Sequence, residues 1–492
     1  MKVLLFLVLS HFLFSSYSLG TGDSCTITDP ASDPCPALHS CIDGFCKHKD
    51  IWPPTKQELI GSILMVIVGG IANSTGAGGS FLLIPILMLL FNYSTNGAIR
   101  VVYSLIFGGM IGAYLGNVRQ REKNTGLPLI QYDLGLVCLP MLLFGASIGV
   151  LMNEFLPSIT TLVALVIILL KTVVSMFRKV KMAWHEERDE RNMRLLSIQP
   201  EMDPPNDENK DSYTMVVPGM SNSDEGTYAI PSFKQRVIDL TVESQVDPSP
   251  DFKSSLKPII DKERRLFPWE RYFEYLLLLG AMITISLIRG TDQVKSIIGL
   301  EYCSTQYWLA YFAIAPVALI FSFRAYWVCK AEYELKLKAG YNFNDRFRLV
   351  PEKIPSFMFI SFVNGVLGSF IGIGGGLLLV PAMIGWGLNS LSAAATSGFL
   401  IIFTSFLSLY LVFLTGEVSN GEWVYFFIVA LLGSLVIGNG LRWLVEKYRR
   451  PSILMIGMLM LVIAGLIILP AYGVVKAIDD PDSLYTFGSF CR

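Results

Sequence analysis

Long apolar segments separated by polar connections are the feature that most limits how this chain can fold. Twelve of them follow one another. A helix needs about 20 apolar residues to cross a bilayer. Because no water is present there to hydrogen-bond backbone N–H and C=O groups, such segments form membrane helices or parts of them. The composition agrees, since 52% of the residues are hydrophobic and 16% are charged. We therefore predict an all-α polytopic membrane protein. The segments lie at 58–74, 79–91, 97–117, 134–153, 156–177, 270–289, 306–328, 355–373, 375–388, 392–414, 423–444 and 452–472.

The first residues, 1–20, have the pattern of a secretory signal peptide. Lys2 is followed by an apolar run at 3–14 and then by the small residues Ser18 and Gly20. The apolar run is shorter than a membrane span requires, so we expect a cleaved signal rather than a retained anchor. The mature chain then begins on the lumenal or extracellular side.

Residues 21–57 form a polar, cysteine-rich segment on that same side. Closely spaced cysteines in an oxidising compartment most often pair, so two disulfides are expected there. A zinc site is the alternative, although no His pair has the spacing that it needs. Two further cysteines fall on the lumenal side in the topology derived below and form another candidate pair. The six candidates are Cys25, Cys35, Cys41, Cys46, Cys303 and Cys491.

Basic residues in the connections predict the orientation, because positively charged loops stay in the cytosol. Lys and Arg cluster after the third, fifth, seventh and eleventh segments, whereas the connections at 92–96, 154–157 and 415–422 contain neither. The long polar segment at 178–268 has no sustained apolar period and is predicted to be a largely disordered cytosolic loop. Both termini of the mature chain are then lumenal or extracellular.

A Gly-rich cluster occurs twice, 296 residues apart. The stretch GGIANSTGAGGSFLLIP at 69–85 aligns with GVLGSFIGIGGGLLLVP at 365–381, and seven of seventeen positions are identical. The predicted orientation requires the first cluster to be a turn inside a helical hairpin. Each hairpin is followed by three more segments, and a two-segment hairpin separates the sets, so the second set enters the membrane from the opposite face.

The fold class that follows is two inverted-topology repeats of about five helical segments, each starting with a Gly-broken hairpin, with a two-helix hairpin inserted between them. The chain divides into a signal peptide (1–20), a Cys-rich lumenal segment (21–57), a first repeat (58–177), a cytosolic loop (178–268), an inserted hairpin (269–328), a second cytosolic loop (329–354), a second repeat (355–472) and a lumenal tail (473–492).

The two Gly clusters are the candidate substrate-binding site. Broken helices of inverted repeats form solute sites near mid-membrane. Glycine permits a positive φ, and the returning half-helix then presents main-chain N–H groups that attract an anion. The alternative is that small residues only permit close helix packing, which we expect for Gly108, Gly112 and Gly116. The candidate residues are Asn73, Ser74, Thr75, Gly76, Gly78, Gly79, Ser80, Arg100, Ser369, Gly372, Gly374, Gly375, Gly376, Thr396 and Ser397.

Charged residues inside the apolar segments are few. Arg100 is placed beside the first hairpin, where its side chain either attracts an anion or extends to the lipid headgroups. Lys171, Arg289, Arg324 and Arg442 lie near segment ends, and we expect them to extend to the headgroups.

Catalytic chemistry is not indicated. Neither Gly cluster has the Gly-Lys-Ser/Thr of a phosphate loop or the βαβ context of a dinucleotide site. Metal-assisted hydrolysis would need ligands inside the spans, whereas every His lies elsewhere. We expect no enzyme, no cofactor, no metal and no nucleic-acid partner. The His residues are His11, His39, His48 and His185.

The chain resembles the sulfite exporter TauE/SafE family in its eukaryotic form. The resemblance rests on the two Gly clusters, with GSFIGIGGGLLLVPAMIGWGLNSLSAAATSGFLIIFTSFLS the closer match, and on YDLGLVCLPMLLFGASIGVLMNEFLP between them. It covers most of 58–177 and 355–472. Arg100 departs from the small polar or apolar residue expected there. The resemblance implies transport of small, usually anionic, sulfur-containing or organic acids, such as sulfite, and no enzymatic activity.

We therefore expect a transporter that moves a small anion, such as sulfite, an organosulfonate or a related organic acid, by alternating access. It would be an integral protein of the plasma membrane or an endomembrane of the secretory pathway. Its partners would be the lipid bilayer and the anionic solute, with a proton or a sodium ion as the candidate coupling ion. The alternative is a membrane receptor or scaffold with a Cys-rich ectodomain and a partner-binding cytosolic loop.

Overall fold

A computed structural model describes most of the apolar segments and their connections. The described residues are 39–42, 45–48, 54–93, 95–122, 126–198, 261–290, 296–338, 347–372, 375–415, 420–448, 450 and 452–479. Several predictions fall outside them and stay predictions: the signal peptide (1–20), Cys25, Cys35, Gly374, Cys491 and most of the tail (473–492).

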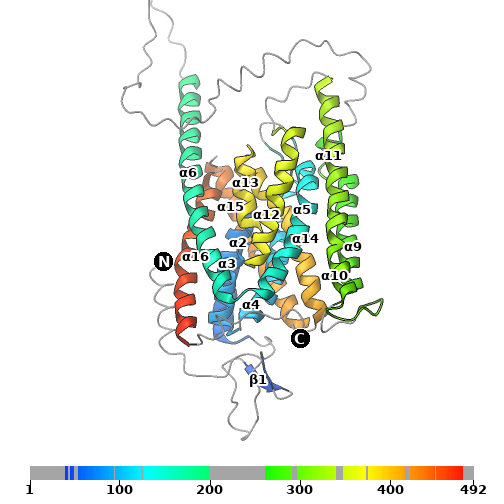
Figure 1. The fold of residues 1–492 in the computed structure, drawn as a ribbon. Helices are drawn as coiled ribbons and strands as arrows, with labels where there is room; N and C mark the ends of the chain where they lie inside the picture. Colours follow the sequence, from blue (N-terminus) through cyan, green and yellow to red (C-terminus); the bar gives the residue numbers. More distant parts are fainter. Residues whose placement is uncertain are drawn as a thin grey trace, which may run out of the picture.

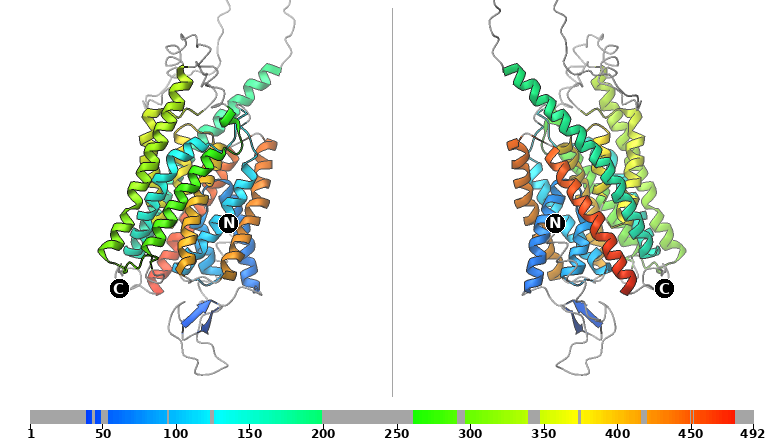
Figure 2. Two further views of the ribbon diagram at one scale, coloured as in Figure 1. Left: turned by 90° about the vertical axis from the view of Figure 1, so that its right-hand side faces the viewer. Right: turned by 90° about the vertical axis from the view of Figure 1, so that its left-hand side faces the viewer.

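The helices of the described residues form one bundle along a common direction (Figure 1, Figure 2). The first half contributes α2 (Lys56–Ser74), α3 (Ser80–Leu90), α4 (Thr95–Asn117), α5 (Tyr132–Phe155) and α6 (Ser158–Ile198). Between the halves lie α9 (Trp269–Arg289), α10 (Thr305–Phe312) and α11 (Ile314–Lys338). The second half contributes a short 3₁₀ turn, η1 (Pro351–Lys353), then α12 (Ile354–Phe370), α13 (Gly376–Gly385), α14 (Ser390–Thr415), α15 (Asn420–Tyr448) and α16 (Ser452–Asp479).

The predicted fold class is confirmed as an all-α polytopic membrane protein. Every predicted apolar segment overlaps a helix, and eight helices within the described residues are long and apolar enough to span a bilayer. A small antiparallel hairpin of β1 (His39–Ile42) and β2 (Phe45–His48) lies beyond one end of the bundle (Figure 1). The sequence did not indicate these two strands. Their register sets Cys41 opposite Cys46.

The most extensive helix–helix contacts join the two halves to each other. Helix α2 lies against α15, while its counterpart in the second half, α12, lies against α5. In the same way α3 contacts α16 and α13 contacts α6, and both α4 with α14 and α6 with α16 form direct pairs. One buried apolar cluster accordingly contains side chains from both halves and from the inserted helices. A second buried cluster contains side chains of α2, α3, α4, α14 and α15, so both clusters interlock the two halves.

Helix α6 continues without a break to Ile198, into the segment at 178–268 that was predicted to be a largely disordered cytosolic loop. Glu187 on this extension accepts hydrogen bonds from both the main-chain N–H and the hydroxyl of Ser452, each at 2.7 Å. Ser452 is the first residue of α16, so the carboxylate caps that helix. The Arg450 guanidinium lies 4.0 Å from the centre of the Trp184 ring. The extension is thus held by the junction of α15 and α16.

Replacing Glu187 with Ala is expected to lower the stability of the detergent-solubilised protein by about 1–3 kcal/mol, because the buried N–H and hydroxyl of Ser452 lose their acceptor. Thermal unfolding measures this. Arg188→Ala is the control, since Arg188 is exposed and its side chain contacts His185 on the same helix. Equal melting temperatures for Glu187→Ala and the wild type would contradict the capping role.

Arg442 does not extend to the headgroups as predicted, because only 6% of it is exposed. On α15, it donates to the Asn117 and Asn439 side-chain oxygens and to the Ala113 carbonyl. A Cβ on Gly116 of α4 would lie 1.9 Å from Arg442 Nη2, so a glycine opposite makes room for the guanidinium. Neutral oxygens of α4 and α15 supply its hydrogen bonds instead of water.

Arg289 has aromatic contacts that the sequence did not indicate. Its guanidinium lies 5.3 Å from the centre of the Tyr307 ring and 4.9 Å from that of Tyr311. These distances are within cation–π range, so Arg289 connects the end of α9 to α10 rather than to the headgroups alone.

Candidate functional site

The first Gly cluster breaks the chain between α2 and α3. Gly76, Gly78 and Gly79 all have positive φ, at 72°, 82° and 69°, a region that only glycine visits readily. The two helices run back along each other, since a Cβ on Gly79 would lie 2.4 Å from the Ala72 Cβ. Further along the pair, a Cβ on Gly61 would lie 2.4 Å from the Phe91 ring. The helical hairpin predicted from the sequence is therefore present.

The second Gly cluster makes a similar hairpin from α12 and α13. Gly372 and Gly375 have φ values of 75° and 77°, and α13 begins at Gly376. Near the open end of the hairpin, the Phe357 and Trp386 rings lie with their centroids 4.4 Å apart. Their contact indicates that α13 returns along α12.

The two turns, called the Gly tips from here on (75–79 in the first, and 371–372 with 375–376 in the second), meet inside the bundle. A Cβ on Gly376 would lie 2.6 Å from the carbonyl oxygen of Gly76. Helix α14 lies against both turns: Ser397 Oγ donates to that same Gly76 oxygen at 3.0 Å, and a Cβ on Gly376 would lie 2.3 Å from Ile401 Cδ1. A Cβ on Gly76 would lie 2.4 Å from the Ala394 oxygen. Clusters far apart in sequence thus share one location.

Two of the predicted polar residues are buried at the first tip without partners. Asn73 is 1% exposed, and neither atom of its amide has a hydrogen-bond partner among the described residues. The Ser80 hydroxyl, at the first position of α3, is also completely buried and unpartnered there. A buried polar group in this condition costs free energy and is often explained by a function.

The other predicted side chains have partners that explain them locally. Ser74 and Thr75 donate to the Gly70 and Ala72 carbonyls of their own helix. Thr396 Oγ1 accepts from the main-chain N–H of Gln131 at 3.0 Å. Ser369 faces α5, because a Cβ on Gly149 would lie 2.9 Å from the Ser369 Cβ.

Arg100 lies apart from the Gly tips. The Asn73 side chain contacts α4 at Gly109, because a Cβ added to Gly109 would lie 1.9 Å from Asn73 Nδ2. Arg100 is nine residues earlier on the same helix, which is about 13 Å along the axis. The structure therefore brings the Gly tips together with Asn73, Ser80 and Ser397, but it places Arg100 toward the other end of α4.

Two residues near the tips were not predicted from the sequence. Asn364 on α12 is 7% exposed, and its side-chain Nδ2 has no partner among the described residues. Its main-chain carbonyl oxygen would lie 3.7 Å from a Cβ on Gly375. Gly109 makes the space that Asn73 occupies. Close helix packing was predicted for the neighbouring Gly108, and it is confirmed, because a Cβ added there would lie 2.3 Å from the main-chain oxygen of Phe427 on α15.

The electrostatics of the tips come from backbone rather than from charged side chains. Helices α3 and α13 both begin at the tips, with Gly79 and Gly375 as their N-caps, so the positive ends of two helix dipoles point there. The atoms closest to added Cβ positions at Gly76, Gly79 and Gly376 all belong to uncharged residues. This arrangement suits a small anion.

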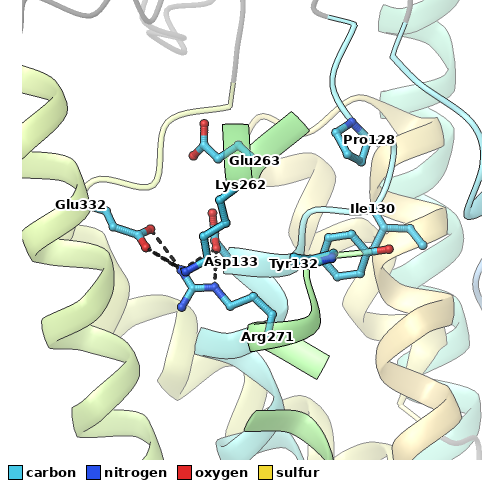
Figure 3. A pocket seen from close by; sticks show the side chains of 9 residues that line it. Pro128, Ile130, Tyr132, Asp133, Lys262, Glu263, Arg271 and Glu332 are labelled. Atoms are coloured by element: carbon cyan, nitrogen blue, oxygen red, sulfur yellow. Dashed lines mark hydrogen bonds and ion pairs between the residues drawn. The ribbon is translucent and has the colours of Figure 1, made fainter. Parts of the chain in front are cut away.

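A second cluster of polar groups lies between α5, α9 and α11 (Figure 3). Arg271 is 2% exposed and pairs with Asp133 Oδ1 at 2.9 Å and with Glu332 Oε1 at 2.9 Å. Lys262 lies 3.6 Å from Glu332 and 2.8 Å from Glu270. Opposite charges satisfy one another in this pocket, so it offers no excess positive charge for an anion. Across the described ranges, no group of His, Cys, Asp and Glu could hold a metal ion.

The fold and the meeting Gly tips define a polytopic membrane protein whose broken helical hairpins meet within an interlocked helical core. A model of the sulfite exporter TauE/SafE family matches residues 46–205 and 272–470, more than half of the chain, and the chain belongs to this family. Its members are transporters, so the chain is a membrane transporter and not an enzyme.

Curated relatives match over most of their length. Sulfite exporter TauE/SafE family protein 2 of Arabidopsis thaliana is 24% identical over 441 residues, covering 87% of this chain and 85% of the relative. Family protein 5 of the same plant is 22% identical, covering 86% of this chain and 84% of the relative. No solved structure matches the chain.

Proposed function

We propose that this protein carries a small anion across a membrane by alternating access, and that the Gly tips with Asn73, Ser80 and Ser397 bind it. The observation that carries the proposal is the buried, unpartnered amide of Asn73 at a point where two helix N-termini meet. Sulfite, an organosulfonate or a related organic acid is the proposed substrate. The names of the relatives, which are sulfite exporter family proteins, support that class.

The exchange of partners between the halves supports a two-fold repeat, and its inverted sense is supported by α6 and α16, because Ser452 at the start of α16 contacts Glu187 toward the end of α6. If a two-fold axis relates the halves, each contact between a first-half helix and a second-half helix must recur between their two counterparts. The pairs α2–α15 and α12–α5 satisfy this, as do α3–α16 and α13–α6. Alternating access would then move the two hairpins against the helices that hold them.

The membrane orientation follows the distribution of basic residues. Helices α6 and α11 extend past the bundle on the face away from β1–β2 (Figure 1). The extension of α6 carries Lys and Arg, and that of α11 carries Lys. This supports a cytosolic location for that face and a lumenal one for β1–β2. Cys303 is not among the free thiols of the described residues, which are Cys138 and Cys329. Its pairing with Cys491 is proposed on the lumenal side.

The receptor or scaffold alternative is not favoured, because the family consists of transporters. The coupling ion, a proton or a sodium ion, remains a proposal. Flux of radiolabelled sulfite and organosulfonates into proteoliposomes tests the function directly. Wild-type protein that carries neither class of anion above the rate of protein-free liposomes would refute the proposal.

The substitution Asn73→Leu distinguishes a role of Asn73 in anion binding from a role in stability. Leu has a similar size and needs no hydrogen bond, so we expect unchanged or higher thermal stability together with a roughly tenfold or larger loss of anion flux. Thr172→Val is the matched control, because Thr172 is also buried but donates within its own helix, α6. Asn73→Leu protein with wild-type flux would remove Asn73 from the site.

A further inference from the structure

Tyr272 of α9 is the centre of a chain of hydroxyl groups that joins three helices. Its hydroxyl oxygen lies 2.7 Å from that of Tyr114 on α4, and it donates to the Tyr132 hydroxyl on α5 at 3.0 Å. Tyr132 in turn donates to the Leu266 carbonyl at 2.9 Å. Each tyrosine is within one turn of a helix end: the end of α4 and the starts of α5 and α9. These ends belong to the face with the basic connections.

The rings of the same tyrosines surround one phenylalanine of the second half. Phe399 of α14 has ring centroids 5.9 Å from Tyr114, 5.4 Å from Tyr132 and 5.8 Å from Tyr272. Distances of this size are favourable for edge and tilted ring contacts. The first half, the inserted hairpin and the second half are therefore joined in one layer.

This layer adjoins a pocket and, through α14, the first Gly tip. On one side, Tyr132 lines the pocket formed with Asp133 and Arg271 (Figure 3). On the other, α14 carries Ser397, which bonds the first Gly tip, only two residues from Phe399. Thr396, which accepts from the main-chain N–H of Gln131 next to Tyr132, is completely buried. The layer and the first Gly tip therefore contact the same turns of α14.

Neutral hydroxyl groups and rings suit a closure that opens repeatedly. Separating a tyrosine pair exposes groups that water can bind, whereas separating the adjacent Arg271 pairs would expose buried charges. The Arg271 cluster is thus suited to hold α9 on α5 and α11, while the hydroxyl chain can break and reform.

We propose that Tyr114, Tyr132, Tyr272 and Phe399, called the tyrosine lock from here on, hold the bundle closed on the face with the basic connections and separate when the Gly tips open to that face. The significance for transport rests on the proposed function. The closure itself can be measured without any transported solute.

Thiol labelling of a buried reporter tests the tyrosine lock. Thr396→Cys is introduced into the full-length protein in detergent and treated with a charged methanethiosulfonate reagent; protein retaining Thr396 gives the background from the native cysteines. Adding Tyr272→Phe removes two hydrogen bonds and keeps the ring. We expect labelling roughly 5- to 10-fold faster, because the open population rises when net hydrogen bonds are lost. Phe273→Leu is the control, since Phe273 is the next residue of α9 and is 66% exposed.

Equal labelling rates with and without Tyr272→Phe, or an equal rise in Phe273→Leu, would overturn the proposal. Tyr114→Phe removes only one of the two bonds and should give a smaller rise; it decides the matter if Tyr272→Phe does not fold. Faster labelling in a protein that carries no anion would leave the tyrosine lock standing and refute the proposed function instead.

Discussion

Gly76→Ala is expected to reduce anion flux to less than about a tenth of the wild-type rate, a change equivalent to more than about 1.4 kcal/mol. Two physical effects combine at this residue. Its φ of 72° is unfavourable for any side chain, and the added Cβ would lie 2.4 Å from the oxygen and 2.8 Å from the Cα of Ala394. Both neighbours are backbone atoms, so the clash is relieved only by separating α14 from the first Gly tip.

Gly126→Ala is the matched control for this substitution. Gly126 has a φ of 68°, almost the same as Gly76, but a Cβ there has no neighbour within 4 Å. It therefore carries the backbone penalty without the collision, and we expect near-normal flux. Proteoliposome uptake measures both variants. Gly76→Ala protein that transports like Gly126→Ala would mean that close contact at the tips is not needed for transport.

The local structure of the tips was predictable from sequence because its causes are local. Clustered glycines between short apolar segments require a turn at membrane depth, whatever surrounds them. Asn73 and Ser80 were found because they adjoin that cluster. Asn364 was missed because it precedes Gly375 by eleven residues, and only the return of α13 along α12 brings the two together.

Charged side chains were harder to place because their surroundings come from other helices. Arg442 near a segment end indicates extension to the headgroups when α15 is considered alone. Its actual position depends on Gly116 and Asn117 of α4, residues more than 300 positions away. The extension of α6 was missed for a different reason: the prediction rested on an apolar period, whereas a helix that is already formed continues through polar residues at little cost.

The charged cluster around Arg271 provides the largest expected effect on stability. Arg271→Met is expected to destabilise the protein by about 3–5 kcal/mol, because it leaves the Asp133 and Glu332 carboxylates facing each other without the guanidinium that separates them. Lys262, 3.6 Å from Glu332, offsets only part of this repulsion. Thermal unfolding in detergent measures the loss.

Arg324→Met is the matched control on the same inserted hairpin. Arg324 also pairs with a carboxylate, Glu274 at 2.9 Å, but its side chain is 60% exposed, so we expect a cost of no more than about 1 kcal/mol. Adding Asp133→Asn and Glu332→Gln to Arg271→Met should restore much of the stability, because the remaining polar groups no longer repel. If the triple variant is as unstable as Arg271→Met alone, then lost packing of the Arg271 side chain, and not unpaired charge, governs this junction of α5, α9 and α11.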